Sequence, residues 1–197
     1  MELSKINSLV ELFFTKYKEL NSSSNKPFLK WLKDNKKNYI TWKQVETNIQ
    51  ILSEYLRKIL SKGDRCILLS ENRPEWLISD IAIMNTGGVT VPLFTTYSEK
   101  DYEYIINDCN PKICIVSNNI QLKKIDKFIS DKVKVLSIEN INDQIDSIES
   151  ILERFSEEKN VNHLSFNQNI ERKDLACIIY TSGTTGNPKG VMLSLSL

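Results

Sequence analysis

The sequence predicts an α/β layered domain with a largely parallel sheet and flanking helices. From residue 66 onwards, short apolar runs that are typical of buried strands alternate with helical patterns. Parallel strands need long crossovers that usually contain helices, so this alternation favours a parallel sheet. The strands are continuously apolar, as burial on both faces requires. A length of 197 residues with 41% hydrophobic side chains allows one domain, or at most two, with a proper core.

The first 25 residues predict an N-terminal helix. Apolar side chains recur there at three- and four-residue steps, which places them on one stripe of a helix. These side chains are Leu3, Ile6, Val10, Phe13, Tyr17 and Leu20. We expect the stripe to be a packing face. A helix lying on a membrane surface is the alternative, which the mixed charges of the polar face disfavour.

A β-hairpin and a second helix are expected next. The hairpin consists of extended runs at 28–32 and 39–41 and turn formers at 34–38. Thr41 and Gln44 have the spacing of a capping box, which predicts a helix start. The apolar stripe of this helix is Val45, Ile49, Leu52, Leu56 and Ile59. Gly63 is expected to end it.

Alternating strands and helices follow. The expected strands are residues 66–70, 89–91, 113–116, 133–138 and 175–180. The expected helices are residues 74–85, 98–108 and 122–129, and a helical stripe through Ile141, Ile145, Ile148, Leu152 and Phe155. A polar linker at 156–172 leads to the last strand.

The composition excludes several function classes. Lysine plus arginine number 26 against 25 aspartate plus glutamate, so the summed field is nearly neutral and offers no long-range attraction for nucleic acid or acidic lipid. Cysteines 66, 109, 114 and 177 are expected to be mostly buried thiols, because no second pair or histidine follows at ligand spacing. No secretory signal or membrane-spanning run is present. We expect a cytoplasmic, soluble protein, with peripheral membrane contact as an open alternative.

The stretch TSGTTGNPKG at 181–190 combines hydroxyls, glycines and one cation at the end of the last predicted strand. Ligands in parallel sheets collect at the carboxyl ends of strands. Glycines let backbone N–H groups approach an anion, while hydroxyls add donors and the lysine adds a mobile charge. The candidate ATP-phosphate residues are Thr181, Ser182, Gly183, Thr184, Thr185, Gly186 and Lys189.

Three other interpretations of this loop are weaker. The P-loop pattern G-x-x-x-x-G-K-[ST] does not fit, because Pro188 and Gly190 occupy its glycine and hydroxyl positions and no helix is expected afterwards. An ordinary turn between strands stays open. A hydrolytic nucleophile at Ser182 lacks its motif, and the only histidine, His163, lies in the polar linker.

Residues 180–191 closely resemble the phosphate-loop signature of the adenylate-forming superfamily, which includes acyl-CoA synthetases and luciferases. Residues 70–76 (SENRPEW) and 87–93 (GGVTVPL) resemble the upstream pattern of acyl-CoA synthetases, in particular the long-chain fatty acid branch. The resemblance implies that a carboxylate attacks the α-phosphate of ATP, with Mg²⁺ on the nucleotide, and that coenzyme A then displaces AMP. Residues 26–197 would be a partial AMP-binding domain whose loop holds the β- and γ-phosphates.

Family members of this kind are several hundred residues long, so the resemblance implies an incomplete, truncated enzyme. The segments for adenine, the acyl tunnel and the adenylation lysine are not in this sequence, so no catalytic residue is assigned. Relatives commonly carry histidine where this chain has Leu195. We expect an N-terminal fragment that needs a longer parent, or the missing part as a separate chain, for turnover. A non-catalytic remnant or interaction module is the alternative.

Overall fold

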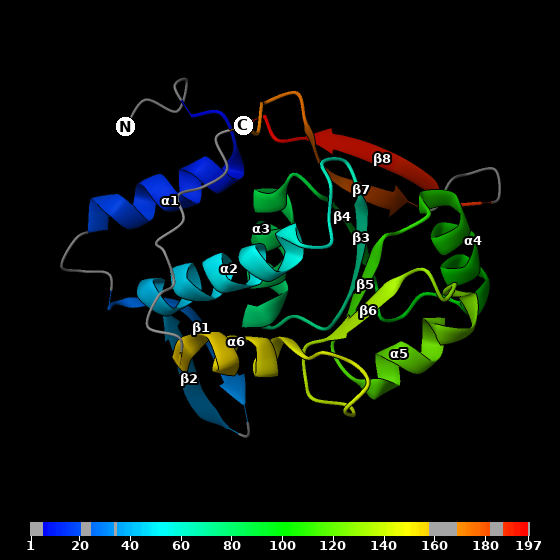
Figure 1. Cartoon of the computed structure of the whole chain (residues 1–197), viewed down its shortest axis with the longest axis horizontal. Coiled ribbons are helices and arrows are strands. Elements are labelled where there is room, and N and C mark those ends of the chain that lie inside the picture. The colour runs from blue at the N-terminus through cyan, green and yellow to red at the C-terminus, as the bar shows by residue number, and fades with distance from the viewer. Residues whose placement is uncertain (1–5, 21–24, 34, 158–168, 182–186, 197) are drawn as a thin grey trace.

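The computed structural model describes residues 6–20, 25–33, 35–157, 169–181 and 187–196. Within these residues a six-stranded sheet has the order β6-β5-β3-β4-β7-β8, with helices on both faces (Figure 1). Its strands are β3 (Arg65–Leu69), β4 (Val89–Leu93), β5 (Ile113–Val116), β6 (Lys134–Ser137), β7 (Leu175–Thr181) and β8 (Lys189–Ser194). All neighbours pair in parallel except β7 and β8, which are antiparallel. The predicted α/β class is therefore confirmed.

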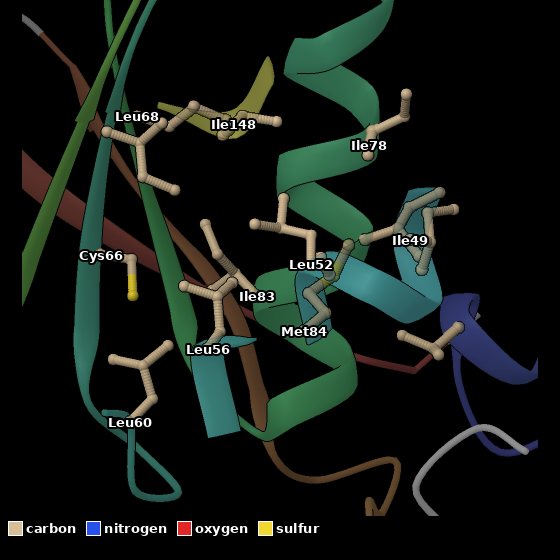
Figure 2. Close-up of a cluster of buried hydrophobic side chains, with 14 of the residues drawn as sticks. Ile49, Leu52, Leu56, Leu60, Cys66, Leu68, Ile78, Ile83, Met84 and Ile148 are labelled. Carbon is tan, nitrogen blue, oxygen red and sulfur yellow. The ribbon is translucent and has the colours of Figure 1, made fainter. Parts of the chain in front are cut away.

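Alternate residues of the central strand β3 face two separate cores. Cys66 and Leu68 belong to a core with the first, second, third and sixth helices, part of which Figure 2 shows. Ile67 and Leu69 belong to a core with the fourth and fifth helices. These helices are α1 (Leu9–Leu20), α2 (Trp42–Arg57), α3 (Pro74–Thr86), α4 (Glu99–Cys109), α5 (Asn119–Ile125) and α6 (Ile148–Glu157). Burial on both faces explains the continuously apolar strands.

The N-terminal stripe is a packing face, as expected. Val10, Phe13 and Phe14 are buried, and the Phe13 ring stacks on Trp42 at 5.6 Å between centroids. The described helix begins only at Leu9, because the Ser8 hydroxyl accepts a hydrogen bond from the Glu11 amide at 3.1 Å and caps the first turn. Leu3, which was expected to extend the stripe, lies outside the described residues.

The hairpin is confirmed, with a tighter turn than the sequence suggested. Its strands are β1 (Pro27–Lys33) and β2 (Lys36–Thr41), which pair in antiparallel register. Asn35 has a φ of 59°, and asparagine tolerates this left-handed conformation, so β2 can begin at Lys36. The turn therefore does not need all of residues 34–38.

The capping box before α2 is confirmed, but the predicted end of that helix is wrong. The Thr41 hydroxyl accepts from the Gln44 amide at 3.2 Å, and the Gln44 side chain accepts from the Thr41 amide at 2.9 Å. The α-helix ends at Arg57. The amides of Lys58 and Ile59 then donate to carbonyls three residues earlier, which tightens the last turn. Gly63, with a φ of 85°, lies in the later turn before β3 instead of capping α2.

Two later helices are shorter than predicted. The helix expected at 122–129 is α5 followed by the 3₁₀ turn η3 (Asp126–Phe128). The stripe expected from Ile141 is helical only from Ile148. The Asn142 side chain accepts hydrogen bonds from the Ile145 amide at 3.1 Å and forms a turn, and Ser147 then caps α6. Such side chains compete with the helical backbone, which periodicity alone does not reveal.

The cysteines behave as expected of thiols. All four are free, and burial raises the pKa of the thiols of Cys66, Cys109 and Cys114. Cys177 is only half-buried. His163 and most of the polar linker lie outside the described residues. Among the helices that the structure describes, none has the length and apolarity needed to cross a bilayer.

Candidate phosphate-binding loop and adjoining pocket

The chain reverses its direction of travel across the sheet after β4, which places a switch point between β3 and β4. From β3 it crosses through α3 to β4 on one side, then returns through α4 to β5 on the other side. The helices α3 and α4 consequently pack on opposite faces of the sheet. Such a switch point leaves a crevice at the carboxyl ends of the strands, where open α/β sheets bind ligands.

A pocket of about 560 Å³ lies at this switch point. Its lining comes from the segments that follow β3 and β4, with two residues of β4 itself, one of β7 and one of α3. The lining residues are Ser70, Glu71, Asn72, Trp76, Pro92, Leu93, Phe94, Thr95, Thr96 and Ile179. Apolar walls with a few polar groups are typical of small-molecule sites.

The candidate loop connects β7, whose Ile179 lines this pocket, to β8. Thr181 ends β7, Lys189 begins β8, and the two residues face each other in the antiparallel register. Both side chains are exposed. The structure thus brings together two of the predicted phosphate residues. The other predicted phosphate residues lie outside the described residues and stay predictions: Ser182, Gly183, Thr184, Thr185 and Gly186.

The strand after the loop decides between two interpretations of it. A P-loop is followed by a helix whose N-terminus faces the phosphate. Here β8 follows, and it runs antiparallel to β7. The P-loop interpretation is therefore wrong. The ordinary turn between two strands would occupy the same place, so the fold alone does not separate it from a phosphate loop.

The residue that precedes the loop is fixed on several sides. The Tyr180 side chain is buried, and its hydroxyl donates to the Asp108 carboxylate on α4. Burial, and then this hydrogen bond, raise the pKa of the Tyr180 phenol, so it stays a donor at neutral pH. The Tyr97 hydroxyl donates to the Tyr180 carbonyl at 3.0 Å. Because of these contacts, the chain enters the loop from a fixed position.

Gly190 makes room for the Tyr180 ring. The two residues are partners across β7 and β8. A Cβ atom on Gly190 would lie 2.9 Å from Cγ2 of Ile178 and 3.2 Å from Cζ of Tyr180. Real Cβ contacts are longer than this, so a side chain at this position would displace its neighbours. Gly190 therefore serves the packing of β7 against β8, which is separate from phosphate contact.

The segment after β4 forms a braced wall of the pocket. The Tyr102 hydroxyl donates to the Phe94 carbonyl at 2.8 Å, and the Lys124 ammonium donates to the Thr95 carbonyl at 2.7 Å. The rings of Phe94 and Tyr97 meet edge to face at 5.3 Å. These contacts hold an otherwise irregular segment against the end of the sheet.

The opposite rim of the pocket is negatively charged. The Glu71 carboxylate accepts a hydrogen bond from the side-chain amide of Gln121 at 2.6 Å. Burial alone would raise the pKa of the Glu71 carboxyl, but the hydrogen bonds that it accepts and the charge of Arg73 outweigh burial, so its pKa lies below its ordinary value. Glu71 is thus ionised at neutral pH and disfavours an anion on its side of the pocket.

The pocket residues at 70–72 and 94–96 were not predicted as a site from the sequence. Both segments directly follow buried strands, and this placement is the signal that could have identified them. The described residues contain no cluster of three histidine, cysteine or acidic side chains that could hold a metal ion.

Comparison with known proteins places these features in a family. The profile of the AMP-binding enzyme family matches residues 17–196. Fatty acyl-CoA synthetase A of Dictyostelium discoideum is 31% identical, over 98% of this chain and 29% of that protein. This chain therefore spans less than a third of that relative's length.

Two solved structures share the fold. A fatty acyl-adenylate ligase from L. pneumophila, in complex with acyl adenylate and pyrophosphate, has a TM-score of 0.73 and 25% identity, over 98% of this chain and 31% of that one. ATP-bound MatB from Rhodopseudomonas palustris has a TM-score of 0.67 and 25% identity, over 90% of this chain and 34% of that one. With the family profile covering nearly all of its sequence, the chain belongs to the AMP-binding enzyme family.

Proposed function

We propose that the chain is the N-terminal part of an ATP-dependent acyl-CoA synthetase that activates a fatty acid, with long-chain acids as the substrate class. Relatives named long-chain-fatty-acid–CoA ligase in Rattus norvegicus and Gallus gallus, each 29% identical over 74% and 91% of this chain respectively, support the substrate class. The coverage of 29% of the Dictyostelium relative supports a partial enzyme. In this proposal residues 1–25 form an N-terminal helical segment and residues 26–197 are part of the AMP-binding domain.

One observation carries the proposal: a loop rich in glycine and hydroxyls leaves β7 beside the switch-point pocket, and Lys189 stands opposite Thr181 at its exit. Hydroxyls and backbone N–H groups of the loop would bind the β- and γ-phosphates of ATP, and Lys189 would add a charge-assisted contact. The apolar pocket beside the loop would receive the less polar part of the reactants.

The chemistry suits such an arrangement. A fatty acid carboxylate attacks the α-phosphate, the bond to the β-phosphate breaks, and pyrophosphate leaves with an added negative charge. Donors that are already positioned around the leaving phosphates stabilise that charge. Coenzyme A would then displace AMP through its thiol. Magnesium would arrive on the nucleotide and neutralise phosphate charge, and this chain would hold the phosphate oxygens. The free thiols support a reducing cytoplasm as the setting.

Calorimetric titration with magnesium-ATP tests the phosphate site. Lys189→Ala should weaken binding by about 1.5–3 kcal/mol, the typical contribution of a hydrogen bond to a charged group. Lys132→Ala is the matched control, because Lys132 is an exposed lysine far from the loop in sequence. Equal affinities of the Lys189 variant and the unchanged chain would contradict the assignment of the loop.

Fatty-acid-dependent pyrophosphate exchange tests the second half of the proposal. We expect no exchange from the isolated chain, and exchange from a chimera in which this chain replaces the matching first part of the Dictyostelium relative. Exchange by the isolated chain would contradict its incompleteness. A folded chimera that binds ATP but never forms acyl-adenylate would favour the non-catalytic module instead.

A further inference from the structure

The hairpin of β1 and β2 presents an unusual exposed face. Lys30 pairs with Tyr39 and Leu32 pairs with Lys37, and because side chains alternate along strands, these four residues share one face. Leu32 is 72% exposed and Tyr39 is 61% exposed. A large aliphatic and an aromatic side chain therefore lie open to solvent between two lysines.

Positive charge is concentrated on this hairpin. Residues 27–41 contain four lysines and one aspartate, in a chain whose total charge is +1. Lys30, Lys36 and Lys37 are exposed, and within the described residues none of them forms a salt bridge. The charges are thus available to an external anion.

The hairpin is held firmly by its other end. Phe28 of β1 packs on Trp42 at 3.9 Å between ring centroids, and both side chains contact the main core. In Figure 1 the hairpin projects at the opposite end of the molecule from β8, which follows the candidate loop. A hollow on the hairpin surface is lined by Pro27, Lys30, Trp31, Leu32, Lys37, Asn38 and Tyr39. The face is therefore a fixed surface, and its Leu32 borders a second hollow that is also lined by Glu71, Glu75, Glu139 and Glu149.

We propose that this face of the hairpin docks on a membrane surface that contains anionic lipids. Lysine ammonium groups would contact the headgroups, while the lysine stems, Leu32 and Tyr39 would enter the interfacial layer. Tyrosine and tryptophan favour the depth of the headgroups. A nucleic acid would use the lysines and stack on Tyr39, but Leu32 offers it no stacking surface. Lipid uses all the exposed groups of this face.

The hairpin is a better membrane-facing segment than the N-terminal helix. The N-terminal helix, the sequence-based candidate, uses its apolar stripe for packing. On the hairpin face Lys30 and Lys37 flank the apolar side chains of Leu32 and Tyr39, whereas the polar face of that helix mixes both signs of charge. Binding of one chain through a small patch should depend strongly on salt, because the screening length falls to a few ångströms near 1 M.

Co-sedimentation of the purified chain with vesicles tests the proposal. The vesicles contain either phosphatidylcholine alone or about three parts phosphatidylcholine to one part phosphatidylserine, a composition with a negative surface potential. The chain should bind the anionic vesicles, and binding should disappear at high salt. The double variant Lys30→Gln with Lys37→Gln should bind about twenty-five-fold more weakly, since each lysine near an anionic surface contributes about a fivefold factor.

Two further variants distinguish the contributions. Leu32→Ser should weaken vesicle binding without changing the circular dichroism spectrum, because the side chain makes few contacts with the body of the protein. Lys100→Gln is the matched control, an exposed lysine on α4 whose loss should leave binding unchanged. Equal binding to neutral vesicles, or binding that ignores the hairpin variants, overturns the proposal. Hairpin-dependent binding of single-stranded RNA without binding to vesicles also overturns it.

Discussion

Gly190→Ala should destabilise the chain although it adds a single methyl group. The new Cβ would lie 2.9 Å from Cγ2 of Ile178, which is attached directly to a branched Cβ and cannot swing away freely. It would also lie 3.2 Å from Cζ of Tyr180, whose buried ring is held by Asp108. Overpacking of this kind costs about 1–3 kcal/mol. We expect the free energy of unfolding to fall by that amount.

Urea unfolding followed by circular dichroism measures this loss. Met192→Thr is the control, because Met192 lies on the same strand with 66% of its surface exposed and threonine suits a strand. The control should change stability by less than about 0.5 kcal/mol. An alanine variant as stable as the unchanged chain would refute the close packing of Tyr180 against Gly190, and with it the fixed entry to the loop.

Two further predictions concern the network around the sheet. Tyr97→Phe removes the hydrogen bond to the Tyr180 carbonyl and should lower the free energy of unfolding, measured with urea, by about 0.5–1.5 kcal/mol. The ATP affinity, measured by calorimetry, should fall as well. If neither value changes, the anchoring role of Tyr97 is contradicted. The hydrogen bond from Lys134 chiefly lowers the pKa of Asp146, so the stabilisation by this carboxylate is present above the unfolded pKa near 4 and is lost as pH falls through the folded value. The stability difference between the chain and Asp146→Asn should therefore shrink in urea unfolding series between neutral and acid pH, and a difference independent of pH would contradict this.

Local sequence signals predicted helices and strands well where no other side-chain hydrogen bond competes with the backbone. Thr41 and Gln44 mark the start of α2 because both partners of the capping box lie within one turn. The same kind of local chemistry also explains the errors. Asn142 and Ser147 use their side chains to form a turn and a cap, which interrupts a stripe that continues in the sequence. Periodicity measures apolar spacing and does not detect such competition.

The site was predictable in part. Thr181 and Lys189 could be assigned because the loop composition and the preceding strand are local features. The pocket beside it depends on the strand order, in which β4 lies next to β3 on one side and β7 on the other. That order arises from contacts between residues far apart in the sequence, so the sequence did not show that Glu71 and Phe94, each just after a strand, line one pocket.

Nuclear magnetic resonance of the ¹⁵N-labelled chain during titration with pyrophosphate tests the central claim most directly. The account predicts saturable shifts of the amides from Thr181 to Gly190, which Lys189→Ala weakens, while the hairpin amides of Lys30 and Tyr39 stay unchanged. Saturable shifts that leave the amides of residues 181–190 unchanged, or no shifts at all, would contradict the assignment of this loop as the phosphate site.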